Sequence, residues 1–228
     1  MVFLHRAYTG RSGTMFGFEG LGSIYWHMVS KLMLATAENF FTALEQGARK
    51  ATCRCLGQLY YRVREGIGFN KTPGEYGAFP TDPYSHTPEH SGARQPGMTG
   101  QVKEEILCRF AELGVRVSAG EVHFRPALLR VREFMTEARD TGYADVDGNW
   151  QTIVVPVAGL TFTWCQVPIT YMLDDDAEQS LTIIRDDGTE ERFSQLTLPA
   201  EHSSELFRRS SRIRQILVTF KTNQLFVE

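Results

Sequence analysis

The sequence lacks the cysteine pattern of a disulfide-stabilised secreted protein. Its 228 residues include four cysteines, at positions 53, 55, 108 and 165, without a framework spacing. Cys53 and Cys55 are two apart in a predicted helix and face different sides, which disfavours a shared metal ion. Free thiols are typical of a reducing compartment, so the sequence predicts a cytoplasmic protein.

Membrane segments and a strong charge are also missing. No stretch approaches the roughly 18 apolar residues of a membrane span, and residues 1–10 lack the pattern of a secretory signal. The formal net charge of −3 gives no reason to expect a nucleic-acid partner. Basic residues do cluster near the C-terminus, where they predict a solvated edge: Arg208, Arg209, Arg212 and Arg214.

Common catalytic motifs are absent as well. The glycine-rich residues 1–20 match neither the phosphate-loop nor the dinucleotide-binding pattern. The chain has no G-x-S-x-G nucleophile elbow. Acids in residues 66–100 show no spacing that singles out a glycosidic pair. We therefore predict no cofactor, and the sequence assigns no catalytic residue.

What the sequence does contain is an irregular segment of unusual length, residues 66–100. It holds five of the nine prolines and shows neither helical nor strand periodicity. A connection longer than about 15 residues in a compact domain is usually functional or disordered. Several aromatic residues among few charges argue against disorder. We therefore expect an ordered loop that carries a site.

Polar side chains of this loop form the main candidate site. A metal would require Asp82, His86 and His90, but Pro88 breaks the helix on which two such histidines could chelate, so no metal is predicted. Aromatic rings and side chains that bond hydroxyl groups suit sugar recognition instead. The predicted sugar-binding residues are Tyr76, Asp82, Tyr84, His86, Arg94 and Gln95.

Helical periodicity marks the chain on both sides of this loop. The Gln46-Gly47 junction indicates a break or bend between the first two helices, and Gly114 ends the third. The predicted helices begin near residue 22, span 48–64 and span 100–113. Their apolar stripes are Ile24, Met28, Leu32 and Ala35, then Ala51, Cys55, Leu59 and Val63, then Val102, Ile106, Phe110 and Leu113.

The start of the third helix is a second candidate site. Thr99 and Gly100 offer a hydroxyl and free backbone N–H groups at the positive end of a helix dipole, an arrangement that binds anions. Simple N-capping by Thr99 would use the same hydroxyl and stays an alternative.

Beyond Val115 the apolar period changes to two. Turn signals at 118–121 and at Asp187-Gly188 predict hairpins, the second with a two-residue loop. Strands are predicted at 115–117, 122–124, 151–156, 159–164, 166–172, 180–185, 191–198 and 213–220, with one helical turn at 203–207. Many short strands predict an antiparallel β-sandwich. The expected fold class is α+β, with a helical part (1–114) and a C-terminal β-sandwich (115–228).

The order of these features resembles the end of the inverting disaccharide phosphorylases. The motifs are the polar-aromatic loop, G-M-T-G at 97–100, a helix, E-L-G-V at 112–115 and G-E-V-H-F-R-P-A-L-L at 120–129 before a β-module. In layout the resemblance covers residues 20–130. The family is that of cellobiose and chitobiose phosphorylases, whose (α/α)6 barrel is shared with related six-hairpin glycoside hydrolases.

The resemblance implies roles for particular residues. Thr99 and Gly100 match the pair that holds inorganic phosphate, and His27 in Ile-Tyr-Trp-His resembles the histidine on the phosphate side. Residues 82–86 would lie on the wall that faces the sugar. Gly97-Met98 replaces the family's aromatic-Leu pair, which leaves phosphorolysis and hydrolysis both open.

The family's catalytic acid lies upstream and has no counterpart here, and the barrel needs more helices than this chain has. We therefore expect the C-terminal part of a longer carbohydrate-active enzyme, which supplies anion- and sugar-binding residues. Apolar helix stripes without barrel partners would be exposed, which predicts self-association.

A second hypothesis is a non-catalytic carbohydrate-binding or interaction module built on the sandwich. Phe162, Trp164 and Tyr171 alternate along two strands and would form its platform if they faced outward. The same alternation fits core positions. An oligosaccharide is the expected partner under both hypotheses, with inorganic phosphate as a further partner under the first.

Overall fold

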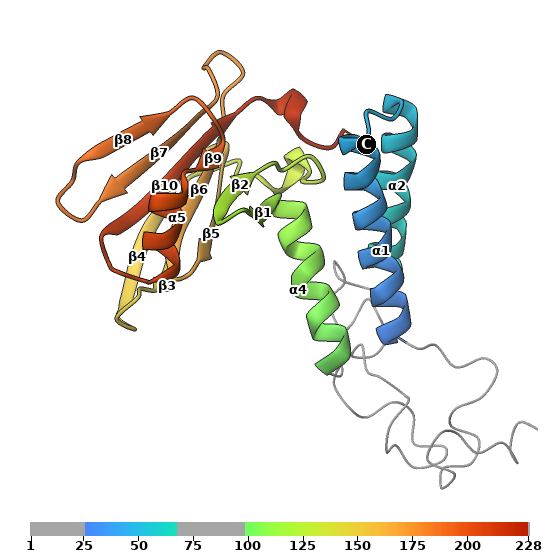
Figure 1. Ribbon diagram of the computed structural model, residues 1–228, viewed down its shortest axis with the longest axis horizontal. Coiled ribbons are helices and arrows are strands. Elements are labelled where there is room, and N and C mark those ends of the chain that lie inside the picture. The colour runs from blue at the N-terminus through green and yellow to red at the C-terminus, as the bar shows by residue number, and fades with distance from the viewer. Residues whose placement is uncertain (1–25, 68–98, 228) are drawn as a thin grey trace, which may run out of the picture. The chain divides into compact units, whose positions relative to one another are not determined.

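The computed structural model describes residues 26–67 and 99–227 of the chain (Figure 1). The chain divides into two compact units, residues 1–109 and 110–228. Helices come first and mostly antiparallel sheets follow, so the protein is a mixed α+β protein, as its sequence predicts at this level. The helices described are α1 (Trp26–Glu45), α2 (Lys50–Ile67), α4 (Thr99–Leu113) and α5 (Ala200–Phe207).

In the first unit, α1 and α2 are consecutive helices that pack side by side (Figure 1). Gly47 has a left-handed φ of 66°, which ends α1 and turns the chain toward α2, as the sequence indicates. The buried side of α1 includes Met33, Ala37, Phe40 and Phe41, with the last two rings edge to face at 5.2 Å.

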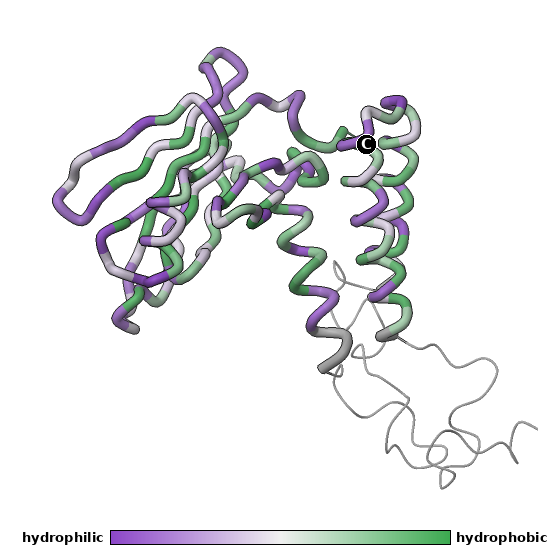
Figure 2. Tube along the Cα trace, in the orientation of Figure 1, coloured by the Kyte–Doolittle hydropathy of each residue, from purple (hydrophilic) through white to green (hydrophobic). Residues whose placement is uncertain are grey.

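Both helices carry a second apolar stripe that faces solvent. Met28 and Leu32 of α1 are 55% and 57% exposed, and Leu59 of α2 is 45% exposed. These are the stripes that the sequence pattern singles out, whereas the buried residues lie on another face of each helix. Hydrophobic residues accordingly recur all along both helices (green in Figure 2). The periodicity of the sequence identifies an apolar face of a helix, but it does not determine which of two apolar faces is buried.

The second unit contains three sheets. A five-stranded sheet has the order β5-β6-β10-β7-β8, a three-stranded sheet the order β1-β2-β9, and β3 and β4 form a two-stranded ribbon. The strands are β1 (Val115–Ser118), β2 (Glu121–Phe124), β3 (Arg139–Ala144), β4 (Trp150–Val155), β5 (Gly159–Trp164), β6 (Val167–Leu173), β7 (Ser180–Arg185), β8 (Glu190–Phe193), β9 (Thr197–Leu198) and β10 (Ile213–Phe220). Short 3-10 helices span Val131–Glu133 and Thr222–Gln224.

The core of this unit lies against one face of the five-stranded sheet. Ile169, Tyr171 and Val218 on that face are fully buried, together with Leu198 of β9. Tyr171 also donates its hydroxyl hydrogen to the carbonyl of Leu113 at 2.6 Å, so the end of α4 is bonded to the sheet. A buried phenol needs such a partner, because an unbonded hydroxyl in an apolar core is costly.

The opposite face of the sheet carries a row of polar side chains. Thr161, Thr170 and Gln215 come from three neighbouring strands and form a hydrogen-bonded row, with Thr161–Thr170 at 2.9 Å and Gln215–Thr170 at 3.0 Å between side-chain atoms. Strand alternation produces the two faces, since successive side chains point to opposite sides. The row of hydroxyl and amide groups therefore lies on the side of the sheet opposite the core, with Thr170 at its centre buried.

Several strand predictions need correction. β10 pairs in parallel with β6, so the largest sheet is mixed rather than antiparallel throughout. The predicted strand 191–198 is two strands, β8 and β9, which belong to different sheets. The sequence did not predict β3, because five of its six residues are exposed and their pattern shows no apolar alternation.

The two predicted hairpin turns are present, but one has a different loop. Ala119 and Gly120 turn β1 into β2 with φ of 51° and 80°. Between β7 and β8 the backbone N–H of Arg185 bonds to the carbonyl of Thr189, so three residues form the loop instead of two. Gly188 has a left-handed φ of 83°, which is the usual conformation at the end of a three-residue loop.

Candidate functional site

The structure describes three of the residues that the sequence assigns to sites. His27 is the second residue of α1, and Thr99 and Gly100 open α4. The predicted sugar-binding residues lie outside the described residues: Tyr76, Asp82, Tyr84, His86, Arg94 and Gln95. The anion site and the loop site therefore stay predictions.

The described residues instead contain a groove between the β3–β4 ribbon and the five-stranded sheet. It consists of two adjoining hollows, hollow A of about 430 Å³ and hollow B of about 410 Å³. Both hollows are lined by Tyr143 of the ribbon, Gln166 of the turn between β5 and β6, and Pro168 of β6, so these residues lie at the junction. Each volume falls in the range of about 300–1,000 Å³ that is usual for small-molecule sites.

Hollow A has an exposed indole at its rim. Trp150 is 75% exposed, although a large aromatic side chain usually buries most of its surface. Its ring lies on Gly142 of the neighbouring strand, where a Cβ atom would come within 2.4 Å of the indole. The glycine therefore lets the ring lie close to the ribbon backbone, and one indole face remains open. Thr161 and Thr163 add hydroxyl groups to the same hollow.

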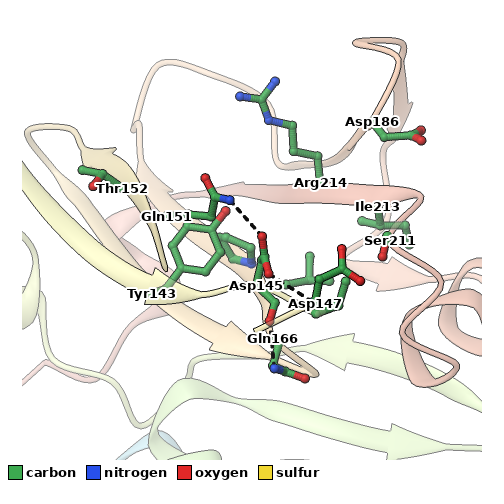
Figure 3. Close-up of a pocket in the computed structure, with 13 residues that line it drawn as sticks. Tyr143, Asp145, Asp147, Gln151, Thr152, Gln166, Asp186, Ser211, Ile213 and Arg214 are labelled. Carbon is green, nitrogen blue, oxygen red and sulfur yellow. Dashed lines mark hydrogen bonds between the residues drawn. The ribbon is translucent and has the colours of Figure 1, made fainter. Parts of the chain in front are cut away.

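Hollow B lies at the end of the ribbon (Figure 3). One oxygen of the Asp145 carboxylate accepts hydrogen bonds from the backbone N–H groups of Asp147 and Asn149, and the other accepts one from the Gln151 amide at 2.8 Å. These bonds, that of Gln151 foremost, hold the pKa of Asp145 below its ordinary value. The Asp145 carboxylate thus shapes the turn that forms one wall of hollow B.

Tyr143 is the aromatic residue at the junction of the two hollows. Partial burial raises the pKa of its phenol, the Arg214 guanidinium opposes that shift, and Asp145 adds to it. In Figure 3 Tyr143 and Gln151 lie on the ribbon side of hollow B, whereas Ser211 and Arg214 come from the side of β10. The phenol is consequently a neutral hydrogen-bond donor and acceptor at neutral pH.

The backbone around hollow B is strained. Cys165 and Gln166 form the two-residue turn between β5 and β6 with φ of 51° and 66°, a conformation that strongly favours Asn-Gly. Arg209 and Ser211 also have positive φ, and Ser211 lines hollow B. Non-glycine residues in such conformations cost about 1–3 kcal/mol each and tend to cluster at functional sites.

The strained turn fixes the position of Gln166. Its amide nitrogen donates to the carbonyl of Asp145 at 2.9 Å, which ties the β5–β6 turn to the turn of the ribbon. Burial raises the pKa of the Cys165 thiol, although the Arg209 guanidinium opposes that shift. The thiol is thus a protonated packing group, and Gln166 is the turn residue that reaches the groove.

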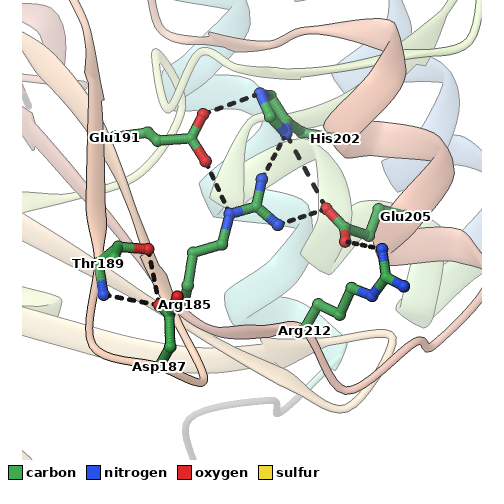
Figure 4. Close-up of polar contacts among 7 residues, drawn as sticks. All are labelled: Arg185, Asp187, Thr189, Glu191, His202, Glu205 and Arg212. Atoms are coloured by element: carbon green, nitrogen blue, oxygen red, sulfur yellow. Dashed lines mark hydrogen bonds and ion pairs between the residues drawn. The ribbon is translucent and has the colours of Figure 1, made fainter.

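A second polar cluster joins α5 to β7 and β8 (Figure 4). Arg185 donates to Glu191 and to Glu205, each at 2.7 Å, and its third contact is the Nδ1 atom of His202 at 3.1 Å. A guanidinium only donates, so Nδ1 is the acceptor and the imidazole hydrogen is on Nε2, which faces Glu191 at 3.4 Å. These groups bond to one another, which indicates a structural clasp between α5 and the sheet.

A functional assignment for this chain rests on the geometry described above, because the comparisons with known proteins provide none. No protein-family model matches the sequence, and no curated protein is significantly similar to it. Within residues 26–67 and 99–227, no three His, Cys, Asp or Glu side chains gather as a metal site would require. None of the helices in these ranges combines the length and the apolar content of a membrane span.

The groove residues were not among the sequence predictions. The platform considered for a binding module was Phe162, Trp164 and Tyr171, but Tyr171 is fully buried, and Phe162 packs on it edge to face at 5.1 Å. Trp164 packs against Phe110 at 4.7 Å between ring centroids. A usable signal was present in the sequence: Cys165-Gln166 separates two strand patterns without a turn-forming residue.

Proposed function

We propose that the β unit binds carbohydrate in the groove between the ribbon and the five-stranded sheet. The observation that carries this proposal is the exposed Trp150 indole, held on Gly142 beside threonine hydroxyls. A sugar ring has an apolar C–H face and a rim of hydroxyl groups. An open aromatic face next to hydroxyl and amide groups complements both parts.

The charges of the groove favour an uncharged sugar over a nucleic acid. Hollow B contains three carboxylates, Asp145, Asp147 and Asp186, and one cation, Arg214. A polyphosphate backbone is bound through several Lys or Arg side chains, and the carboxylates here would repel it. Sugar hydroxyls, in contrast, donate readily to carboxylates.

The experiment is a binding screen of the full chain against β-1,4-linked gluco-, N-acetylgluco-, manno- and xylo-oligosaccharides of one to six units. We expect binding to at least one series, with dissociation constants raised by about tenfold or more in Trp150→Ala, because the stacking surface is lost. Trp150→Phe keeps a smaller ring and should retain much of the affinity.

Phe207→Ala is the matched control, since Phe207 is another exposed aromatic residue of the same unit and does not line the groove. Its affinity should equal that of the wild type. Absence of binding by the folded wild-type chain to all four series would refute the proposal, as would equal affinities of wild type and Trp150→Ala.

A second candidate function places this groove in an enzyme. We propose that the chain is the C-terminal part of a carbohydrate-active enzyme that cleaves glycosidic bonds by phosphorolysis or hydrolysis, with α1 and α2 as the end of an α/α barrel and the sheets as a β-sandwich. The resemblance of the G-M-T-G segment supports this proposal, and so does the start of α4 at Thr99. The Thr99 hydroxyl and the first N–H groups of α4, at Thr99 and Gly100, would hold the attacking phosphate, and the resemblance assigns His27 to the same role.

Calorimetric titration with inorganic phosphate tests this second function. Binding that is lost in Thr99→Ala and kept in Thr99→Ser would support an anion site at the start of α4. A folded wild-type chain without heat of binding would rule out phosphate use by this chain and leave hydrolysis as the enzyme function.

The exposed apolar stripes on α1 and α2 indicate that a partner covers them in the second candidate function. Met28, Leu32 and Leu59 are apolar groups that barrel neighbours would cover. We propose that the chain self-associates through them. Light scattering should show a mass that increases with concentration, and Leu32→Glu should reduce it; a wild-type monomer at all concentrations would contradict this proposal.

A further inference from the structure

We infer that the groove holds at least two consecutive sugar units, one in each hollow, and that Gln166 is the specificity-determining residue at their junction. This inference rests on the proposed carbohydrate-binding function. It goes further by assigning the length of the ligand and the residue that reads its linkage region. Three observations carry it: the shared lining of the hollows, their contrasting chemistry, and the strained turn.

The shared lining makes the two hollows one continuous site. Tyr143, Gln166 and Pro168 line both, so a ligand in one hollow would continue directly into the other. Each hollow by itself has the volume of a small-molecule site. A single sugar unit would leave one of them empty, whereas two linked units would place their connecting oxygen beside Tyr143 and Gln166.

The two hollows also differ in chemistry. Hollow A combines the Trp150 indole with the hydroxyls of Thr161 and Thr163, and none of its lining residues is charged. Hollow B has carboxylates and one guanidinium around it. The sugar unit in hollow A is therefore held mainly by stacking on the indole, and the sugar unit in hollow B mainly by hydrogen bonds from its hydroxyls.

Gln166 occupies a position of the strained turn that favours glycine, and the contacts of its side chain explain why glutamine is present there. With φ of 66°, residue 166 would be more stable as glycine, yet its side chain lines both hollows and its amide nitrogen is fixed on the Asp145 carbonyl. That bond leaves the amide oxygen as the acceptor for a sugar hydroxyl at the junction. Strain kept at a ligand-facing side chain is the pattern of a functional position.

Chain length provides the first test. The four oligosaccharide series, from one to six units, are titrated against the full chain. For the series that binds, we expect affinity to rise by about tenfold or more from one unit to two, because the second hollow then becomes occupied. Equal affinity for monosaccharide and disaccharide would overturn the two-unit site while leaving carbohydrate binding intact.

Three variants test Gln166. Gln166→Ala removes the amide and keeps a strained side chain, Gln166→Gly removes both, and Cys165→Gly relieves strain in the same turn while keeping the amide. We expect the disaccharide affinity to fall by about tenfold in both Gln166 variants, which corresponds to loss of one hydrogen bond, and to stay unchanged in Cys165→Gly.

Unfolding midpoints in urea complete this test, because they separate binding loss from misfolding. Gln166→Gly should unfold at a higher urea concentration than Gln166→Ala, since glycine accepts the left-handed conformation. Wild-type affinity in Gln166→Ala would remove Gln166 from the site. A glycine variant no more stable than the alanine variant would show that the turn stores no strain. If the wild-type chain bound no sugar at all, the proposed function itself would fail.

Discussion

Two hairpins of the five-stranded sheet reverse the chain with different kinds of residue at their left-handed positions. The β7–β8 loop contains Gly188, whose φ of 83° costs nothing for glycine, and its Asp187 carboxylate bonds to Thr189 at 2.9 and 2.7 Å. The β5–β6 turn has left-handed conformations at Cys165 and Gln166, neither of which favours them. Both hairpins close correctly, so strand pairing by itself does not require strain.

The difference correlates with what lies next to each turn. Gly188, the left-handed residue of the relaxed loop, lines neither hollow, although Asp186 of the same loop lines hollow B. The left-handed Gln166 of the strained turn lines both hollows. Of these two left-handed positions, the one whose own side chain has no part in the groove is glycine, and the one whose side chain lines the groove is another residue. The strain can persist because Trp164 and Val167 pair on either side of the turn.

The largest expected effect concerns a third left-handed position, at which glycine cannot be replaced. A Cβ atom on Gly114 would lie 2.1 Å from the backbone of Arg125, and the residue has a φ of 68°. We expect Gly114→Ala to lower the free energy of unfolding by about 3 kcal/mol or more, because backbone atoms cannot move away cheaply. Urea denaturation measures it; a loss below 1 kcal/mol would mean that the α4–β1 junction adapts.

The next effect concerns the clasp at the relaxed end of the sheet. Replacement of Arg185 by methionine would remove the guanidinium that bonds to Glu205 and His202, both largely buried, and would leave Glu205 only the more distant Arg212. We expect a loss of about 2 kcal/mol in the free energy of unfolding. The control is Arg212→Met, whose side chain is 74% exposed and 4.0 Å from Glu205; it should change stability by less than about 0.5 kcal/mol. Equal effects would contradict the clasp.

The comparison of the two turns itself predicts unequal effects on stability. Gly188→Ala should destabilise by about 1 kcal/mol from its φ alone, since its Cβ would meet no atom within 4 Å. Cys165→Gly should lose little or gain stability, because relief of strain offsets lost packing of the partly buried thiol. Thermal unfolding of both variants measures the pair. Destabilisation of similar size in both would break the comparison.

The smallest effect is a pH dependence at hollow B. Because hydrogen bonds in the folded state lower the pKa of Asp145, the carboxylate stabilises the fold above its ordinary pKa, and this contribution is lost as pH falls through the lowered value. Asp145→Asn should therefore lower the unfolding midpoint at pH 7, and the difference from wild type should shrink toward pH 3. A difference that did not change with pH would contradict this role.

The control for that measurement is Asp147→Asn in the same turn. Asp147 contributes its backbone N–H to the Asp145 carboxylate, and the substitution leaves that group in place. Its midpoint should equal that of the wild type at both pH values. This pair separates the hydrogen-bonding role of one carboxylate from the general charge of the turn.

Much of the fold could be predicted from local patterns. The strands at 159–164, 180–185 and 213–220 are observed with the predicted bounds, and Gly47 and Gly114 end their helices as expected. These features depend on alternation and on glycine at left-handed positions, both of which are visible in a few consecutive residues. The β3 strand could not be found in this way, because its residues face solvent.

The groove could not be predicted, because its parts are far apart in the chain. Trp150 matters through Gly142 of the paired strand, and Gln166 matters through the Asp145 carbonyl. Neither relation follows from spacing. The sequence directed attention to residues 66–100, where polar and aromatic side chains are dense. The described groove instead draws its residues from strands β3 to β6, from β10 and from the turns next to them.

The amino-acid sequence alone determined the order of most helices and strands, the positions of two hairpin turns and the presence of apolar stripes on the helices. Only the tertiary structure decided which stripe of α1 and α2 is buried, that β10 lies parallel to β6, and that a strained turn places Gln166 between two hollows. The physical reason is one of range. Local preferences act over a few residues, but burial, strand partnership and tolerated strain depend on contacts between distant segments of the chain.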